Sequence, residues 1–238
     1  MPQLLFLDLE TTGLDLGTCE VIEVAYCIDG KFTSSLFRPS QTEIPPEVSG
    51  VTNIDNNDVK DCEGFRGSDI YNQLAQYAAE GYILVTHNTD FDQSVLSNHG
   101  INFNRSICTY KLAWKYLPEL ANHKLGTLRA YFGIGHSGEA HRAEYDVEIL
   151  IRVFESITLK ILPLTARKDF LMAGQFTQKL TELSDEAKAE YLDIFQFGKY
   201  KGKKISEVMR YDRSYMNWLR ENTTDPQLKS YIIKLMNS

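Results

Sequence analysis

Short apolar runs along the first half of the chain predict the strands of a sheet. The first, at residues 4–9, begins with four consecutive apolar residues, and the second, at residues 21–28, is rich in β-branched residues. A third run at residues 31–37 follows an Asp-Gly turn dipeptide, and a fourth covers residues 82–86. We therefore expect a β-sheet in this half of the chain.

Helical periodicity alternates with these strands. Residues 68–80 predict a helix, because Ser68 is a suitable N-cap, the apolar residues share one face and a glycine follows. A second helix is expected from about Phe91, and a long one over residues 144–161. Residues 38–67, rich in proline, asparagine and aspartate, predict a long irregular connection. The alternation of strands with helices indicates an α/β domain.

The composition changes after the long helix and divides the chain into three parts. We expect the α/β domain at residues 1–162. Residues 163–195 combine helical spacing with many charges and a thin apolar face, which is typical of a helical linker. Residues 196–238 are predicted to form a small module, which opens on a glycine-rich hairpin signal (FGKYKGK) and continues into helices that carry Trp218 and Leu219.

The net charge of the chain, −7, disfavours a nucleic-acid partner at first sight, but the charge is unevenly distributed. Residues 197–204 contain four lysines and no acid: Lys199, Lys201, Lys203 and Lys204. Such a basic segment is compatible with contacts to nucleic-acid phosphates, with Tyr200 available to stack on a base. A hairpin kept soluble by its lysines explains the segment equally well, so both interpretations stay open.

The composition is typical of a soluble globular protein, with 43% hydrophobic and 24% charged residues. The longest apolar runs are too short to cross a bilayer. A secretory signal segment is not expected, because Asp8 and Glu10 interrupt the only candidate. The 4 cysteines are scattered without a Cys-x-x-Cys pair, which favours reduced thiols in a cytoplasmic protein without membrane contact.

Two carboxylates, Asp8 and Glu10, interrupt the first predicted strand. They are two residues apart, so on a strand their side chains point to the same face. Adjacent carboxylates at the end of a buried strand repel each other unless a positive charge lies between them. Because oxygen ligands favour Mg²⁺ or Mn²⁺ over zinc, the pair indicates a candidate site for such an ion. Alternatively, the strand ends at Leu7 and both acids face water.

Two further acids belong to predicted helices. Asp92 lies in the opening turn of the helix after strand 82–86, and Asp146 lies in the first turns of the long helix. His141 precedes Asp146 by five residues, about 140° around a helix, so we expect it on the preceding loop. A histidine with an ordinary pKa of about 6.5 is suited to accept a proton from water. A solvent-exposed loop histidine is the alternative.

Three short motifs together resemble those of the DEDDh family of 3′→5′ exonucleases. They are Asp8-x-Glu10 in a strand, His-Asn-x-x-Phe-Asp ending at Asp92, and His141-x-x-x-x-Asp146, in the family's order across residues 4–155. The segments ICTYKLAWKYLP and FGKYKGKKISEVMRYDRSYMNWL are similar to parts of exodeoxyribonuclease X-like proteins, the second to their small carboxy-terminal module. The likeness extends over nearly the whole chain.

The resemblance implies a ribonuclease H-like exonuclease fold, in which helices flank a mixed sheet and strand ends present acids. It also implies that Asp8, Glu10, Asp92 and Asp146 hold two Mg²⁺ or Mn²⁺ ions, which in two-metal sites lie ~3.5–4 Å apart. By the same resemblance His141 is the general base, and nucleoside 5′-monophosphates are released from the 3′ end. We therefore expect an exodeoxyribonuclease whose partner is the 3′ end of DNA.

The family pattern also assigns contacts to the bound nucleic acid. The segment expected at the terminal nucleotide is Thr11, Thr12, Gly13 and Leu14, and an apolar Leu14 would wedge against the base. His87 and Asn88 match motif positions near the bound strand. A plain strand-to-turn junction is the alternative for the first segment, and local hydrogen bonding is the alternative for the second.

Two positions fall outside these assignments. Glu23 fits a family pattern in the second strand, but no chemical role follows from it. Thr52 occupies a position, in the run Val51 to Asp55, at which related enzymes usually have a histidine. Substrate contacts by this loop are therefore in doubt, whereas the expected metal chemistry is unaffected.

Three other functions remain open. An exoribonuclease would use the same metal site, since discrimination depends on contacts to the 2′-hydroxyl, although the exodeoxyribonuclease X-like tail favours DNA. A proofreading subunit of a replicative polymerase would need a polymerase-binding tail that the sequence does not show. A non-catalytic nucleic-acid-binding protein would be free to lose one of the four acids or His141, and all five are present.

Overall fold

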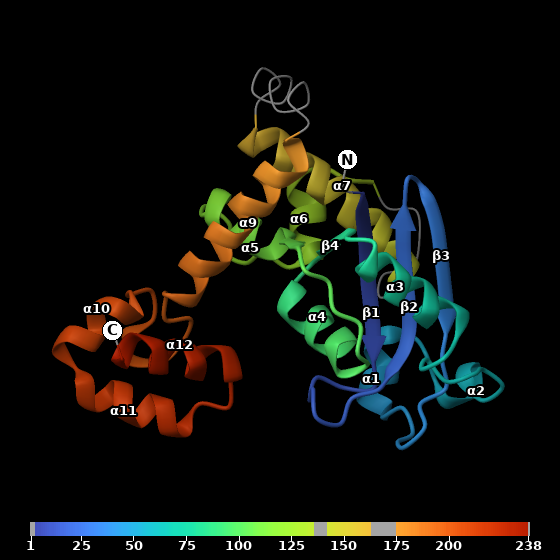
Figure 1. Cartoon of the computed structure of the whole chain (residues 1–238), viewed down its shortest axis with the longest axis horizontal. Helices are drawn as coiled ribbons and strands as arrows, with labels where there is room; N and C mark the ends of the chain where they lie inside the picture. The colour runs from blue at the N-terminus through green and yellow to red at the C-terminus, as the bar shows by residue number, and fades with distance from the viewer. Residues whose placement is uncertain (1–2, 136–141, 163–174, 238) are drawn as a thin grey trace. The chain divides into compact units, whose positions relative to one another are not determined.

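The chain divides into two compact units. The computed structural model describes residues 3–135, 142–162 and 175–237 (Figure 1). The first unit extends over Met1–Ser184 and the second over Asp185–Ser238. Within the described ranges, the helices are too short or too polar to cross a membrane.

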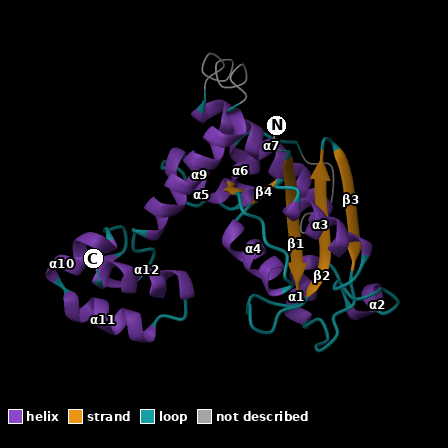
Figure 2. Ribbon diagram, viewed as in Figure 1, coloured by secondary structure: helices purple, strands orange, loops and turns teal. Residues whose placement is uncertain are grey.

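A mixed sheet of five strands forms the framework of the first unit (Figure 2). Its strands are β1 (Leu4–Thr11), β2 (Val21–Ile28), β3 (Lys31–Leu36), β4 (Ile83–Thr86) and β5 (Ser106–Cys108). Their order is β3-β2-β1-β4-β5, which places β1 at the centre. β2 is antiparallel to β1 and β3, whereas β4 is parallel to β1 and β5. The predicted mixed sheet flanked by helices is confirmed.

Helices flank the sheet, and several of them connect its strands. Up to residue 192 they are α1 (Pro46–Thr52), α2 (Asn56–Val59), α3 (Asp69–Ala79), α4 (Thr89–Asn98), α5 (Thr109–Tyr116), α6 (Leu125–Tyr131), α7 (Ala143–Ile161) and α9 (Phe176–Leu192). The helices expected over residues 68–80 and 144–161 correspond to α3 and α7. α3 starts where predicted because the hydroxyl of Ser68 accepts a hydrogen bond from the N–H of Tyr71.

The alternation of side chains along β1 decides which residues meet α7. The leucines at odd-numbered positions of β1 pack with residues of α3 and α4 in one hydrophobic cluster. Phe6 belongs to the opposite face and contacts Phe154 of α7, with ring centroids 5.2 Å apart. Because successive strand residues point to opposite faces, Asp8 and Glu10 lie on the same face as Phe6, toward α7.

The connection predicted to be irregular at residues 38–67 contains two short helices, α1 and α2, which corrects that prediction. A capping box formed by Asp55 and Asp58 closes the start of α2. Helices of 7 and 4 residues are too short to show apolar periodicity, so the pattern could not reveal them. The hydroxyl of buried Thr52 donates to the carbonyl of Val48 at 3.0 Å, so this side chain is engaged within the protein.

The second unit is a small helical module with its own core. It contains a 3₁₀ turn (Gly198–Tyr200) and the helices α10 (Ile205–Tyr211), α11 (Arg213–Asn222) and α12 (Pro226–Met236). Its buried residues are Phe195, Tyr200, Ile205, Val208, Met216, Leu219, Leu228 and Ile232. In place of the predicted hairpin there is one isolated antiparallel bridge, between Ile194 and Lys204. The turn between them depends on Gly198 and Gly202, both at positive φ.

The packing of α7 on the sheet generates a stability prediction. Leu150→Ala should lower the free energy of unfolding by about 2–5 kcal/mol, because Leu150 is 1% exposed and its loss leaves a cavity. Leu159→Ala, on the same helix but 46% exposed, should change it by less than about 0.5 kcal/mol. Urea denaturation measures both values, and equal losses would contradict this placement of α7.

Candidate active site

Three carboxylates converge where β1 meets α7. Asp8 and Glu10 come from β1, and Asp146 comes from the first turn of α7. Each offers one oxygen atom, and the three oxygens lie within 4.8 Å of one another. β1 continues to Thr11 and both of its acids are only partly accessible, so they do not end the strand in open water. We call Asp8, Glu10 and Asp146 the acid cluster.

The fourth predicted acid, Asp92, comes from α4. It lies in the first turn of that helix, and it is 5% exposed. Because β4 is parallel to β1 and leads into α4, Asp92 follows a strand that ends beside the acids of β1. Among the neighbouring charges, that of Asp92 contributes most to raising the pKa of Asp8. The structure thus brings Asp92 into electrostatic contact with the acid cluster, although it is not one of the three mutually close ligands.

Burial and mutual repulsion make these acids hard to ionise. Burial raises the pKa of Asp8 well above its ordinary value, and the charges of Asp92, Glu10, Asp146 and Glu23 raise it further. The pKa of Glu10 rises to about 8, mainly through burial and then through the charges of Asp146 and Glu23. Burial raises the pKa of Asp92 to about 7, against hydrogen bonds from the Thr86 side chain and the backbone. Ionisation at neutral pH therefore requires a compensating positive charge.

A divalent cation fits this set of donors. Among the described residues the cluster offers carboxylate oxygens without sulfur or imidazole, which is the donor set that Mg²⁺ and Mn²⁺ prefer. An ion among these oxygens would favour the ionised form of each acid and remove the repulsion between them. His141, the predicted general base, lies outside the described residues.

Glu23 of β2 fixes the start of α7 and thereby the position of Asp146. Its side chain is 3% exposed, and its residue pairs with Glu10 across the antiparallel ladder. Oε1 of Glu23 accepts hydrogen bonds from Nε and Nη2 of Arg142 at 3.3 and 3.2 Å. Oε2 accepts the N–H of Ala143, the first residue of α7, at 3.1 Å. A carboxylate from a different element therefore caps the helix that carries Asp146.

Arg142 completes this contact, and neither residue's part in it followed from the sequence. Arg142 occupies the N-cap position of α7 and makes no side-chain capping bond of its own. The sequence shows an arginine just before a predicted helix and an acid within a predicted buried strand. A buried acid needs a cationic or N–H partner, which is the signal that could have linked Glu23 to this helix terminus.

The segment at the end of β1 contains two buried polar residues and one exposed apolar residue. Thr11 and Thr12 are each 7% exposed. The hydroxyl of Thr11 donates to the carbonyl of Gly13 at 2.6 Å, and the hydroxyl of Thr12 accepts the N–H of Glu20 at 3.0 Å. Leu14 is 84% exposed. The threonines thus stabilise the turn, and Leu14 is the side chain of this segment that projects into solvent.

His87 is held within the protein by both ring nitrogens. Nε2 lies 2.9 Å from the carbonyl oxygen of His123 and donates to it, and Nδ1 lies 2.9 Å from the hydroxyl oxygen of Thr109. Burial lowers the pKa of His87 to about 4, so the ring is neutral at pH 7. Asn88 is exposed and has a φ of 79° at the N-cap of α4. The predicted contacts of His87 and Asn88 with nucleic acid stay predictions.

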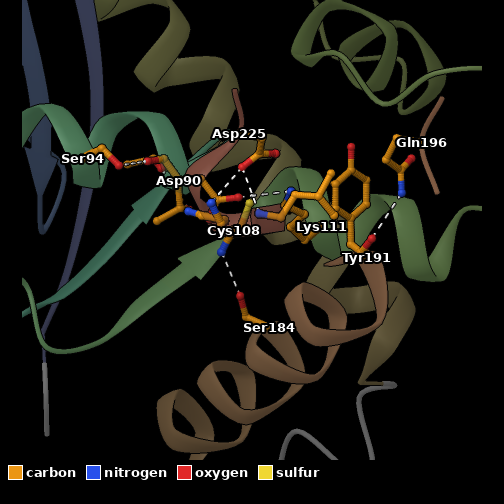
Figure 3. Close-up of polar contacts among 12 residues, drawn as sticks. Asp90, Ser94, Cys108, Lys111, Ser184, Tyr191, Gln196 and Asp225 are labelled. Atoms are coloured by element: carbon orange, nitrogen blue, oxygen red, sulfur yellow. Dashed lines mark hydrogen bonds and ion pairs between the residues drawn. The ribbon is translucent and has the colours of Figure 1, made fainter. Parts of the chain in front are cut away.

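Polar contacts also fix the helix that carries Asp92 (Figure 3). Nζ of Lys111, a residue that is 6% exposed, lies 3.2 Å from Oδ2 of Asp90. The hydroxyl of Ser94 donates to the carbonyl of Asp90 at 2.6 Å. The N–H of Cys108, at the end of β5, donates to the hydroxyl of Ser184 at 2.8 Å. The ion pair between Lys111 and Asp90 therefore links α5 to the first turn of α4, and Asp90 lies two residues before Asp92.

The predicted nucleic-acid residues of the module differ in exposure. Lys199, Lys201, Lys203 and Lys204 are all exposed. Tyr200 is 8% exposed, and its hydroxyl donates to Oδ2 of Asp212 at 2.6 Å. This burial corrects the expectation that Tyr200 stacks on a base, because its ring is covered by its neighbours.

Known protein families match both units of the chain. A family profile described as "Exonuclease" matches residues 5–154. A second profile, described as "Exodeoxyribonuclease X-like C-terminal", matches residues 195–223. The first match contains the acid cluster and Asp92, and the second contains the lysine-rich segment.

The chain is also similar to individual known proteins. "Exodeoxyribonuclease 10" of Escherichia coli (strain K12) is 29% identical over 235 residues, which are 94% of each chain. "DNA polymerase III subunit epsilon" of Aquifex aeolicus (strain VF5) is 29% identical over 170 residues, 65% of this chain and 81% of that one. The structure "Exonuclease X in complex with 5' overhanging duplex DNA" has a TM-score of 0.56 at 24% identity and covers 76% of this chain and 99% of that chain. At this identity the structural likeness shows the fold.

The raised pKa values predict how pH and metal affect stability. The folded, metal-free protein holds protons on Glu10 up to about pH 8 and on Asp92 up to about pH 7, whereas carboxyls of the unfolded chain lose them near pH ~4. The folded state therefore binds more protons over this window, and the free energy of unfolding falls as pH rises. With a chelator, the melting temperature should be lower at pH ~8 than at pH ~6.

Saturating Mn²⁺ should raise the melting temperature more at the higher pH, because it replaces the lost protons as counter-charge. Asp8→Asn should raise the melting temperature of the metal-free protein at the higher pH and weaken the response to Mn²⁺. Glu155→Gln, an exposed position on α7, serves as the control. If the melting temperature of the wild-type protein changes neither with pH nor on addition of Mn²⁺, a metal site at the acid cluster is ruled out.

Proposed function

The chain belongs to the exonuclease family, and from this premise we propose that it hydrolyses DNA stepwise from the 3′ end with divalent metal ions. The family profile covers residues 5–154, which is more than half of the chain. The resemblance indicated by the short motifs is thereby confirmed, as is the prediction of an exonuclease hydrolase. The substrate, the number of metal ions and the role of each residue belong to the proposal.

The acid cluster is the observation that carries this proposal. Three carboxylates within 4.8 Å of one another destabilise a fold unless a positive charge compensates them, since each is partly desolvated and repelled by the others. Metal-assisted hydrolysis of a phosphodiester requires such a site, because the substrate and the attacking water must both be brought against positive charge. The supporting elements, including the cap from Glu23, hold the site on β1 and α7.

We assign the following roles to the residues of the site. Asp8, Glu10 and Asp146 hold the metal, and Asp92 contributes a fourth carboxylate from α4. Four carboxylates provide ligands for two ions, Mg²⁺ or Mn²⁺. When bound, divalent ions supply activation of water and neutralisation of the charge on the leaving oxygen. His141 accepts the proton of the attacking water. Leu14, exposed after β1, packs against the terminal base.

DNA is the proposed substrate because the likeness includes the module. The relative named exodeoxyribonuclease 10 aligns over 94% of this chain, and the exodeoxyribonuclease X-like profile matches residues 195–223. An exoribonuclease would use the same acid cluster, so the experiment below includes RNA. A cytoplasmic location, expected from the scattered cysteines, is part of the same proposal; all 4 thiols are free.

Removal of single acids tests the site. Asp8→Ala and Asp146→Ala should each lower kcat by more than about a hundred-fold. Removing a residue that holds the metal ion lowers activity more than removing a residue that only orients such a ligand. The assay follows 5′-labelled DNA and RNA of identical sequence with Mg²⁺ or Mn²⁺, beside the surface control Glu155→Ala. Shortening of DNA from the 3′ end is expected. If only RNA is shortened, RNA and not DNA is the substrate. Activity that is retained in Asp8→Ala would refute the acid cluster as the active site.

The proposed base predicts a pH profile. Single-turnover cleavage should accelerate between pH ~6 and ~8 as the imidazole of His141 loses its proton. His141→Gly should slow the step by about 10²- to 10⁴-fold and flatten the profile, and added imidazole should restore part of the rate. A wild-type profile that is flat over this range, with chemistry still the measured step, would exclude His141 as the base.

A further inference from the structure

The second unit presents aromatic rings and lysines side by side around buried Tyr200. Nζ of Lys199 lies 4.7 Å from the centroid of the Tyr200 ring, and Nζ of Lys203 lies 5.7 Å from it. The ring of Tyr211 meets that of Tyr200 at 6.0 Å, and the ring of Tyr215 meets it at 5.1 Å. Tyr200 is therefore the centre from which two lysines and two further rings extend.

Trp218 continues this surface along α11. Its ring lies 5.7 Å from that of Tyr215 at an interplanar angle of 31°. Lys199 also lies over Tyr215, with Nζ 6.0 Å from the centroid. We call Lys199, Lys203, Tyr211, Tyr215 and Trp218 the aromatic–lysine patch. These separations connect each member of the patch to another member or to Tyr200.

The patch exposes large rings that the core of the unit does not use. Trp218 is 55% exposed and Tyr211 is 60% exposed, whereas their neighbours Met216 and Leu219 are buried. Exposed aromatic rings that lie together commonly mark a binding surface. The folded unit therefore keeps two rings in water, although burying them would stabilise it.

Asp212 lies at the patch, and its hydrogen-bonding capacity is used inside the unit. Its Oδ2 accepts from the hydroxyl of Tyr200 at 2.6 Å and lies 3.1 Å from Nζ of Lys199. Its Oδ1 accepts from Ser214 and from the N–H of Tyr215. These bonds hold the pKa of Asp212 well below its ordinary value, so it stays ionised and positions Lys199 and the rings.

Charge distinguishes this unit from the rest of the chain. Residues 185–238 contain 10 lysines and arginines against 8 aspartates and glutamates, whereas residues 1–184 contain 15 against 24. The exposed lysines Lys201 and Lys204 adjoin the patch in sequence. An apolar protein partner would favour an interface core depleted of lysine, which this patch is not. Rings combined with lysines suit a strand of bases and phosphates.

We propose that the aromatic–lysine patch binds single-stranded DNA. Bases stack on Trp218 and Tyr211, and the ammonium groups of Lys199 and Lys203 contact phosphates. Stacking on rings does not depend on base identity, so the contact is independent of sequence. The inference rests on the proposed function for its choice of DNA, and it assigns to the module a second contact with the substrate class of the exonuclease unit.

Tryptophan fluorescence of the full chain tests the stacking directly. The chain has 2 tryptophans, so Trp114→Phe leaves Trp218 as the reporter and Trp218→Phe leaves Trp114. EDTA suppresses hydrolysis, and the probe is a single-stranded oligothymidylate. Quenching is expected in Trp114→Phe and not in Trp218→Phe. Quenching that is absent from Trp114→Phe, or equally strong with a base-free phosphodiester of the same length, would overturn the proposed stacking.

Salt dependence tests the lysines. The slope of log binding constant against log salt should become less steep by about 0.7 for each phosphate contact removed, hence in Lys199→Ala and again in Lys203→Ala. Lys229→Ala, an exposed lysine on α12 that makes none of the ring contacts described above, should leave the slope unchanged. Identical slopes in all variants would exclude the lysines as phosphate contacts. Circular dichroism of each variant verifies that the unit is folded.

Failure of this inference and failure of the proposed function are separable. The proposed function is tested on the wild-type chain with the p-nitrophenyl ester of thymidine 5′-monophosphate, a substrate too small to reach beyond the acid cluster. Hydrolysis of the ester together with an unresponsive Trp218 would refute the patch alone. Quenching of Trp218 without hydrolysis of the ester would refute the exonuclease and keep the patch as a DNA-binding surface.

Discussion

Electrostatic repulsion among Asp8, Glu10, Asp92 and Asp146 is the constraint on which the rest of the first unit depends. Burial adds to that repulsion, as the raised pKa values of Asp8 and Glu10 show, and burial is the main cause of the raised pKa of Asp92. The acids come from β1, α4 and α7, so the repulsion tends to separate three elements of the fold. The sheet and its flanking helices must oppose it whenever the compensating cation is absent.

Each of these elements is held by contacts that do not involve the acids themselves. β1 is the central strand, paired on both sides. The start of α7 is capped by Glu23, and its apolar face packs on the sheet through residues such as Val147. α4 is tied to α5 by the ion pair between Asp90 and Lys111. A divalent cation then adds to a geometry that apolar packing and buried polar bonds have already established.

The sequence predicted the parts of this molecule that leave local signals. Strands such as 21–28 and the long helix α7 show clear apolar patterns, and the ordered motifs identified the family. β5, with three residues, and helices α1 and α2 leave no periodicity, because their boundaries depend on caps and tertiary contacts. Burial of Tyr200 was equally hidden, since a tyrosine between lysines appears exposed until the helices of the module cover it.

The contact of Glu23 with α7 has a direction that a simple ion pair lacks. One oxygen serves the guanidinium of Arg142, and the other serves the N–H of Ala143. Exchanging the two charged residues would preserve opposite charges, yet a guanidinium in β2 cannot accept the N–H of a helix start. Positions 23 and 142 are therefore constrained as an ordered pair, and compensating substitutions between them could preserve the charge balance while still disrupting the helix start that positions Asp146.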